Sequence, residues 1–224
     1  MKRRMNDNFN QIILKEIKNP NPIFLDIGAG EAESINRFKN ILPNCIMHSF
    51  EPIEERIQII KSWLQTFTHN NNITLNHCAM GDKIEEKTFY VNGKRKASSF
   101  LKLNEKNKID SLKKEIKINV NTVDNYVKQN NIKYIDYLKI DTQGYESQIL
   151  RGAKNLLKNL KGVLAETSLV SLYENQKLWL EIINELALHG FEAWIIDRTL
   201  NDSKTGRTLQ VDIVFYRNNI NLNN

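Results

Sequence analysis

Short apolar runs alternate along the chain with longer segments in which apolar residues recur every three or four positions. A short run bounded by turn residues predicts a buried strand, and the three-and-four spacing predicts an amphipathic helix. A short helix is also predicted at 123–127, with Asn121 near its N-cap. Other strands are predicted at 23–27, 45–50, 73–79, 137–141 and 163–166. Other helices are predicted at 35–42, 53–67, 149–160 and 178–188. This alternation indicates an α/β fold with a mostly parallel sheet and helices on both faces.

The middle and the end of the chain depart from this rhythm. Short predicted strands at 88–91 and 116–120 flank a polar, Lys-rich stretch at 94–114, where we expect loops close to the functional site. The last two predicted strands, 193–196 and 211–216, are joined without a helix. Such a connection favours an antiparallel hairpin at one edge of the sheet.

Length and composition bound the organisation of the chain. With 224 residues, of which 41% are hydrophobic, it fits one globular domain, which we place at 21–217 between a helical extension at 1–20 and a disordered tail at 218–224. No apolar run is long enough for a membrane span, and the N-terminus lacks the apolar core of a secretory signal. Cys45 and Cys78 have no metal or redox spacing, so we expect reduced thiols in a cytoplasmic protein.

Acidic residues stand at the predicted ends of four core strands. These residues are Asp26, Glu51, Asp141 and Glu166. In an open α/β sheet, ligands bind beyond the carboxyl ends of the strands. Four acids at such ends are harder to explain as solvated surface than one would be, so we expect them to surround a ligand site.

The turn after the first strand carries Gly28 and Gly30, and glycine lets the backbone approach a ligand closely. The carboxylate of Glu51 can accept hydrogen bonds from both ribose hydroxyls of a nucleoside. The alternative is that Glu51 only stabilises the N-terminus of the following helix through the helix dipole. A dinucleotide fingerprint would need Gly or Ala where Glu33 stands, and Glu31 adds negative charge where a pyrophosphate would lie. Because negative charge tolerates a sulfonium and an α-amino group, we favour S-adenosylmethionine over NAD.

Several motifs occur in a fixed order over residues 20–217. They are 26–30 (DIGAG), 50–52 (FEP), 122–124 (TVD), 138–146 (LKIDTQGYE), 150–153 (LRGA), 210–212 (QVD) and Phe215. In these motifs the chain resembles the FkbM-type methyltransferase family, and 138–153 is the most specific part. The sequence departs from the family pattern in its glycine loop, where Gly30 replaces Asn and Ala32 replaces Gly. It departs again at Thr142 and Gln143, where the family usually has Val-Glu, so one carboxylate is absent here.

The resemblance implies a class I methyltransferase Rossmann-like fold with a mostly parallel seven-stranded sheet and an antiparallel edge hairpin. It also implies methyl transfer from S-adenosylmethionine, typically to a hydroxyl, on a sugar or another small-molecule or glycan acceptor. Carried over by position, the cofactor-binding residues are Asp26, Gly28 and Gly30 at the methionine end, Glu51 at the ribose, and Ala79, Met80 and Asp82 at the adenine. For Asp82 the alternative is an ordinary acidic residue in a turn.

A hydroxyl is a poor nucleophile at neutral pH, so a carboxylate beside it is expected to take its proton. Asp141 is the first candidate for this base and Glu166 the second. A divalent metal such as Mg²⁺, shared by these two carboxylates, is an alternative that no motif supports. Glu146 is expected to orient the turn at the start of its helix. Lys139 either neutralises charge or forms a structural ion pair. Among the histidines, His77 on the predicted third strand is the one worth testing.

Other functions remain open at this level. Lys139, Asp141 and Glu166 resemble the K-D-K-E arrangement of RNA ribose 2′-O-methyltransferases, and the net charge of +6 permits an anionic partner. Nucleic acid is nevertheless the less favoured acceptor, because the sequence shows neither an RNA-binding module nor an aromatic-rich basic patch. A catalytically inactive nucleoside-binding module and a dehydrogenase are further alternatives. The stretch 94–114, with Ser98 and Ser99, either shapes or covers the acceptor pocket or forms a disordered surface loop. The oligomeric state cannot be read from the sequence.

Overall fold

A computed structural model describes residues 7–93, 97–107 and 109–217, so the tail predicted at 218–224 lies outside the described residues. The main sheet has the strand order β3-β2-β1-β7-β8-β10-β9. Its strands are β1 (Ile23–Ile27), β2 (Ile46–Phe50), β3 (Ile73–Asn76), β7 (Tyr137–Ile140), β8 (Gly162–Ser168), β9 (Phe191–Asn201) and β10 (Thr208–Arg217). Neighbouring strands from β3 to β8 are parallel, whereas β10 is antiparallel to both β8 and β9. The predicted parallel sheet with an antiparallel edge hairpin is therefore confirmed.

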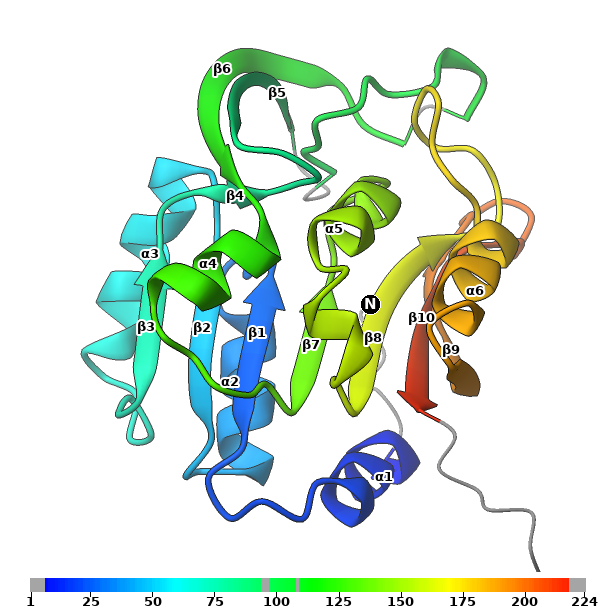
Figure 1. The fold of residues 1–224 in the computed structure, drawn as a ribbon. Helices are drawn as coiled ribbons and strands as arrows, with labels where there is room; N and C mark the ends of the chain where they lie inside the picture. Colours follow the sequence, from blue (N-terminus) through cyan, green and yellow to red (C-terminus); the bar gives the residue numbers. More distant parts are fainter. Residues whose placement is uncertain (1–6, 94–96, 108, 218–224) are drawn as a thin grey trace, which may run out of the picture.

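Helices cover both faces of this sheet (Figure 1). One face carries α4 (Val123–Gln129), α5 (Glu146–Gly152) and α6 (Trp179–Ala187), and the other carries α1 (Asp7–Glu16), α2 (Glu33–Ile41) and α3 (Glu54–Leu64). Side chains alternate between the faces along β1: Leu25 and Ile27 join the first core, and Phe24 joins the second. The second core also buries Ile13 of α1, so part of the predicted 1–20 extension packs against the sheet.

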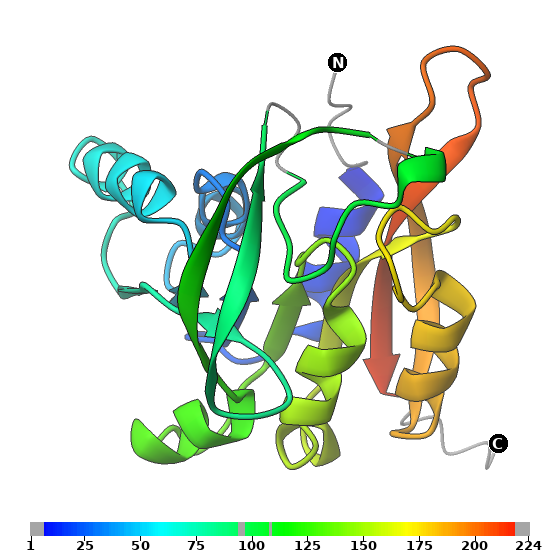
Figure 2. The same ribbon diagram turned by 90° about the horizontal axis from the view of Figure 1, so that it is seen from above.

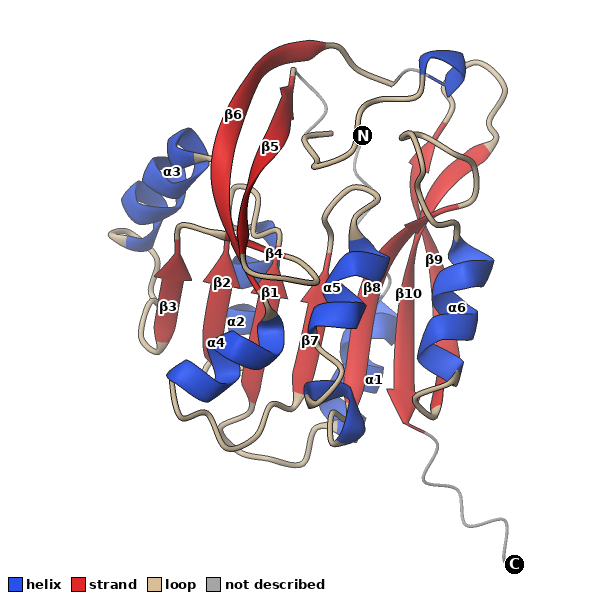
Figure 3. Cartoon of the chain, turned by 45° about the horizontal axis from the view of Figure 1, so that its top comes forward, coloured by secondary structure: helices blue, strands red, loops and turns tan. Residues whose placement is uncertain are grey.

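A second, three-stranded sheet stands above the carboxyl ends of the main strands (Figures 2 and 3). Its strands are β4 (Ala79–Met80), β6 (Leu112–Asn121) and β5 (Glu85–Asn92), in that order, and β5 and β6 form an antiparallel pair. The predicted strand 73–79 was therefore wrong as one element, because β3 ends at Asn76 and β4 pairs with β6 instead. Ser99 forms a β-bridge with Tyr90 of β5, and Leu103 packs with Leu172 and Tyr173 in a small apolar cluster. These parts of 94–114 are therefore packed against the rest of the domain.

The N-cap of α4 is Thr122, whose hydroxyl accepts from Asn125 N at 3.1 Å, while the Asn121 side chain accepts from Thr122 N. The prediction that Asn121 lies near this N-cap is therefore confirmed. One other predicted element was wrong for a local reason. The predicted helix 149–160 is divided into α5 and a 3₁₀ turn at Leu156–Lys158. The Asp124 carboxylate accepts from the backbone N–H groups of residues 155 and 156 and so caps the second segment as a separate start. Among the described residues, no helix is both long and apolar enough to span a membrane.

Candidate active site

A cavity of about 550 Å³ opens at the carboxyl ends of β1, β2, β7 and β8, under β5 and the segment that follows it. Its lining includes seven of the nine residues proposed from sequence: Gly28, Gly30, Glu51, Ala79, Met80, Asp141 and Glu166. Glu166 lies inside β8 rather than at its end, because pairing with β10 extends this strand to Ser168. The structure therefore brings most of the predicted residues together.

The glycine loop after β1 is shaped by close backbone contacts. Gly28 has a φ of +82°, and a Cβ at this position would lie 2.0 Å from the carbonyl oxygen of Asp141, so only glycine fits. The N–H of Gly30 donates to Glu51 Oε2 at 2.9 Å, and the N–H of Ile53 donates to Oε1 at 3.0 Å. The loop amide that would face a phosphate in a dinucleotide site is thus already bonded to a carboxylate. Burial raises the pKa of Glu51, against the lowering effect of Arg56 and these N–H donors.

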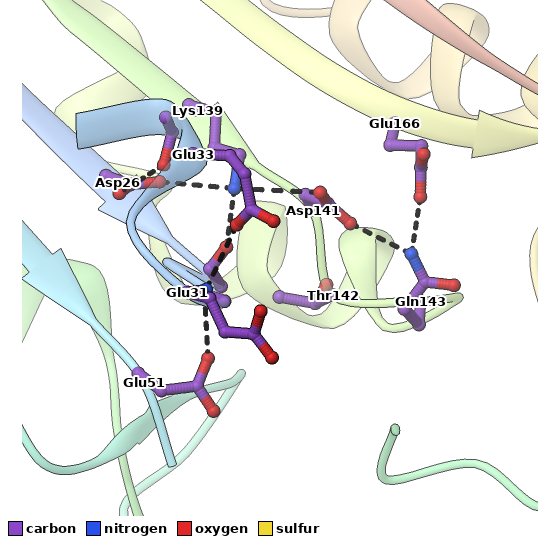
Figure 4. A network of polar contacts seen from close by, with 12 residues as sticks. Asp26, Glu31, Glu33, Glu51, Lys139, Asp141, Thr142, Gln143 and Glu166 are labelled. Atoms are coloured by element: carbon purple, nitrogen blue, oxygen red, sulfur yellow. Dashed lines mark hydrogen bonds and ion pairs between the residues drawn. The ribbon is translucent and has the colours of Figure 1, made fainter. Parts of the chain in front are cut away.

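Asp26 and Lys139 hold this loop through an ion pair and hydrogen bonds (Figure 4). Asp26 is fully buried and is not one of the described residues that line the cavity. Its carboxylate accepts a hydrogen bond from Ser34 Oγ at 2.6 Å and forms an ion pair with Lys139 Nζ at 3.1 Å. Lys139 also donates to Gly28 O at 2.6 Å and lies 3.7 Å from Asp141 Oδ2. Burial alone would lower the pKa of Lys139, but Asp26 and Asp141 outweigh it, and the pKa stands above its usual value. Lys139 therefore forms an ion pair that ties the loop to β7.

Acidic and amide side chains gather at the other end of the cavity. Asp212 on β10 lies directly across from Glu166 on β8, and across from Asp197 on β9. Gln143 Nε2 donates to Asp141 Oδ1 at 2.9 Å and also to Glu166 Oε2 (Figure 4). Burial, reinforced by the neighbouring acids, raises the pKa of Glu166 well above its usual value. Burial and the charge of Asp141 raise the pKa of Asp212 to about 7.

This group was only partly found from sequence. Gln143, Gln210 and Asp212 belong to the motifs found in the sequence, but none of them was predicted as a site residue. In the structure, Gln210 Nε2 donates to Glu166 Oε2 at 3.2 Å. The one available signal was the alternation of Gln210 and Asp212, which places both side chains on one face of a strand. Their register against β8 is a long-range property that the sequence does not display.

The adenine end of the predicted site has an apolar wall. Ala79 and Met80 line it together with three aromatic side chains that sequence reasoning missed: Phe89, Phe100 and Tyr145. The ring centroids of Phe89 and Phe100 are 4.9 Å apart, and those of Phe100 and Tyr145 are 4.8 Å apart. This is an apolar surface of the kind that a flat base can contact.

Asp82 lies outside the cavity lining among the described residues, and its carboxylate is 3.4 Å from Arg151 Nη2. His77 was wrongly placed on the third strand: it follows β3, and its Nδ1 is 3.0 Å from Glu54 Oε2. Cys45 and Cys78 are free thiols, and burial raises the pKa of each to about 11. Within the described residues, no group of three or more His, Cys, Asp or Glu side chains is arranged to hold a metal ion.

Glu146 has the role expected of it. It is buried, and its Oε1 accepts from the N–H of Thr142 at 3.2 Å and from the N–H of Gly144 at 3.0 Å. Burial raises the pKa of Glu146 to about 7, although these N–H donors act in the opposite direction. The carboxylate thus fixes the turn that connects β7 to α5.

Solved structures identify the fold as that of class I methyltransferases. The match to an rRNA methylase from Streptococcus thermophilus covers 97% of this chain and 98% of the methylase chain, with a TM-score of 0.55 and 11% identity. The magnesium protoporphyrin IX methyltransferase ChlM from Synechocystis PCC 6803, solved with bound S-adenosylmethionine, covers 94% of this chain and 77% of its own, with a TM-score of 0.55 and 10% identity. At such identities the likeness shows the fold alone.

The family follows from the sequence comparison. The model of the methyltransferase FkbM domain matches residues 26–193, and the chain belongs to this family. The 2-O-methyltransferase NoeI of Sinorhizobium fredii (strain NBRC 101917 / NGR234) is 24% identical over 178 residues, which span 73% of this chain and 70% of the relative. The resemblance read from the motifs is therefore confirmed.

Proposed function

We propose that the protein is an S-adenosylmethionine-dependent O-methyltransferase that acts on a hydroxyl of a sugar or another small-molecule or glycan acceptor. The observation that carries this proposal is one cavity that joins two parts. The Gly28–Gly30 loop, held by Glu51, forms one part, and the carboxylates of Asp141 and Glu166 form the other. A cofactor site and a proton acceptor would thus share one cavity, as group transfer to a hydroxyl requires.

The donor set suits a cationic nucleoside better than a diphosphate. Gly28 leaves room for close backbone approach, and Glu51 faces the cavity as an acceptor for ribose hydroxyls. Ala79 and Met80 offer an apolar surface to adenine. Glu33 and Glu51 both line the cavity beside the loop, where they would repel a pyrophosphate.

S-adenosylmethionine supplies an activated methyl group when bound, so the chain has to align the acceptor and remove one proton. Burial and its acidic neighbours disfavour the charge of Glu166 and raise its pKa well above the usual value, so Glu166 is less suited to act as the base. Asp141, whose side chain is 38% exposed, faces the cavity beside it and is our assignment for the base. The acceptor hydroxyl would pass its proton to Asp141 as its oxygen takes the methyl group, and the bond between that methyl carbon and sulfur would break to leave S-adenosylhomocysteine.

Two features favour this proposal over the alternatives. Lys139 is held by Asp26 and by the backbone of Gly28, which makes it a support of the loop rather than a free member of a ribose-methylating tetrad. Asp141 and Glu166 line the cavity together with the glycine loop, which argues against an inactive binding module. A metal shared by this pair stays a prediction, and the free thiols favour the expected cytoplasmic setting.

Transfer of a labelled methyl group tests the proposal. The purified chain would be incubated with methyl-labelled S-adenosylmethionine and, separately, with monosaccharides, glycan fractions and total RNA. We expect label in a glycan or small-molecule fraction, and no label with Asp141→Asn. Label only in RNA, removed by ribonuclease, would replace the proposed acceptor class. Label in no fraction, together with no binding of S-adenosylhomocysteine, would refute the enzyme assignment.

A further inference from the structure

The turn between β7 and α5 holds Gln143 in an unusual backbone conformation. Its φ is +58°, in the left-handed region that non-glycine residues rarely adopt, and Gly144 follows with a φ of +98°. The turn is closed by Glu146, which accepts from the N–H groups on both sides of Gln143. Strained backbone of this kind persists only where the surrounding structure enforces it.

The side chain of Gln143 joins the two carboxylates of the proposed base pair. Its nitrogen has two N–H donors; one goes to Asp141 Oδ1 at 2.9 Å and the other to Glu166 Oε2. Its Oε1 accepts from the hydroxyl of Tyr173 at 3.1 Å and lies 3.5 Å from Gln210 Nε2. The amide is therefore held with its nitrogen toward the acids, since the reverse orientation would bring its oxygen against two carboxylates.

This arrangement leaves one oxygen of each carboxylate for other partners. On Asp141 that oxygen is Oδ2, which lies 3.7 Å from Lys139 Nζ, at the side of the residue that faces the glycine loop. The N–H that Gln143 donates holds Oδ1 and so fixes the orientation of the Asp141 carboxylate. The pair is surrounded by charged or titratable groups from the elements packed against it. They are Asp26 (β1), Arg37 (α2), Lys139 (β7), Glu146 (α5), Tyr173 (after β8), Asp197 (β9) and Asp212 (β10).

We propose that Gln143 is a positioning residue, which orients Asp141 and Glu166 as a unit and keeps Asp141 able to accept the proton of the acceptor hydroxyl. This inference rests on the proposed function, because it assigns a task to the same pair. A glutamate here would add a further acidic group beside Asp141 and Glu166, whereas the amide supplies two donors and no charge. The neutral residue is thus matched to the crowding of acids contributed by β8 and β10.

The pH dependence of the methyl-transfer rate at saturating substrate tests the inference in three variants. Gln143→Gly keeps the left-handed backbone without strain and removes only the side chain. Gln143→Glu keeps the shape and adds charge, and Gln129→Glu, at an exposed position on α4, is the matched control for an added charge. S-adenosylhomocysteine affinity and thermal melting are measured for each protein.

Both Gln143 variants should lower kcat at pH 7 by about 10-fold or more and move the acidic limb of the kcat profile to higher pH by about one unit. The sign follows because loss of a donor, or gain of a negative neighbour, makes Asp141 harder to ionise. S-adenosylhomocysteine should bind within threefold of wild type, and Gln129→Glu should leave the profile unchanged. If Gln143→Glu does not fold, the glycine variant decides alone.

An acidic limb that stays at its wild-type position in Gln143→Gly would overturn the inference, whether kcat falls or not. This outcome leaves the proposed function intact, because wild-type methyl transfer and S-adenosylhomocysteine binding are measured in the same series. Failure of wild type in both of those measurements would instead remove the proposed function and the inference with it.

Discussion

The two ends of the cavity are built in different ways. The proposed cofactor end depends on short segments that directly follow neighbouring strands, with a glycine loop after β1 and Glu51 after β2. The acidic end depends on the register of distant strands, since Asp212 reaches Glu166 only because β10 runs antiparallel to β8. The first arrangement depends on close backbone packing at the glycine loop, and the second depends on the balance of charge among its acids. Substitutions at each end should therefore fail in different ways.

The largest effect is expected from Gly28→Ala. A Cβ would meet the carbonyl oxygen of Asp141 at 2.0 Å and the residue would need a positive φ, so we expect a loss of about 3 kcal/mol in the free energy of unfolding and no cofactor binding. Gly206→Ala is the matched control, because Gly206 has a φ of +72° with nothing among the described residues within 4 Å of its Cβ. The control should lose only about 1 kcal/mol in urea unfolding. Equal losses in the two variants would contradict the packing explanation.

Asp141→Asn should act on chemistry rather than on shape. We expect kcat to fall by about 100-fold or more, because the acceptor proton loses its base. Binding of S-adenosylhomocysteine, measured by calorimetry, should change by less than about threefold, since the loop is held by Glu51 and Lys139. Full activity in this variant would remove the assignment of Asp141.

Asp212 should make stability depend on pH. Its folded pKa is about 7, against an ordinary value of 3.8, so the folded state retains a proton that the unfolded state loses. Stability from this group is fully present below pH 3.8 and declines as pH rises toward 7. Asp212→Asn should therefore flatten the fall in unfolding free energy between pH 5 and 7 by about 1–3 kcal/mol, measured with urea. Parallel curves for the two proteins would show that Asp212 is not held protonated.

The smallest effect is expected from Asp82→Asn. The carboxylate of Asp82 is part of a half-exposed pair with Arg151, and such pairs contribute little to stability. The affinity for S-adenosylhomocysteine should change by less than about twofold in calorimetry. A drop of 10-fold or more would restore the sequence-based assignment of Asp82 to the adenine amino group.

The contrast between the two ends also explains what the sequence could predict. The strand at 23–27 was predicted to the residue, because Pro22 and Gly28 bound a short run that is apolar except for Asp26. Its loop and Glu51 follow from the same local pattern. The break after α5 could not be predicted, because the capping group, Asp124, lies 31 positions before the N–H that it accepts from. The role of Gln143 was hidden for the same reason, since Tyr173 and Glu166 reach it only in the fold.

The preference of the pocket for a cationic sulfur nucleoside over a diphosphate is the central claim, and calorimetry tests it most directly. Wild-type protein would be titrated with S-adenosylmethionine, S-adenosylhomocysteine and NAD under one set of conditions, with Glu51→Gln as a probe of the ribose contact. We expect both sulfur nucleosides to bind, each about 10-fold more weakly in Glu51→Gln, and NAD to give no heat of binding. Saturable binding of NAD, with no binding of either sulfur nucleoside, would contradict the claim.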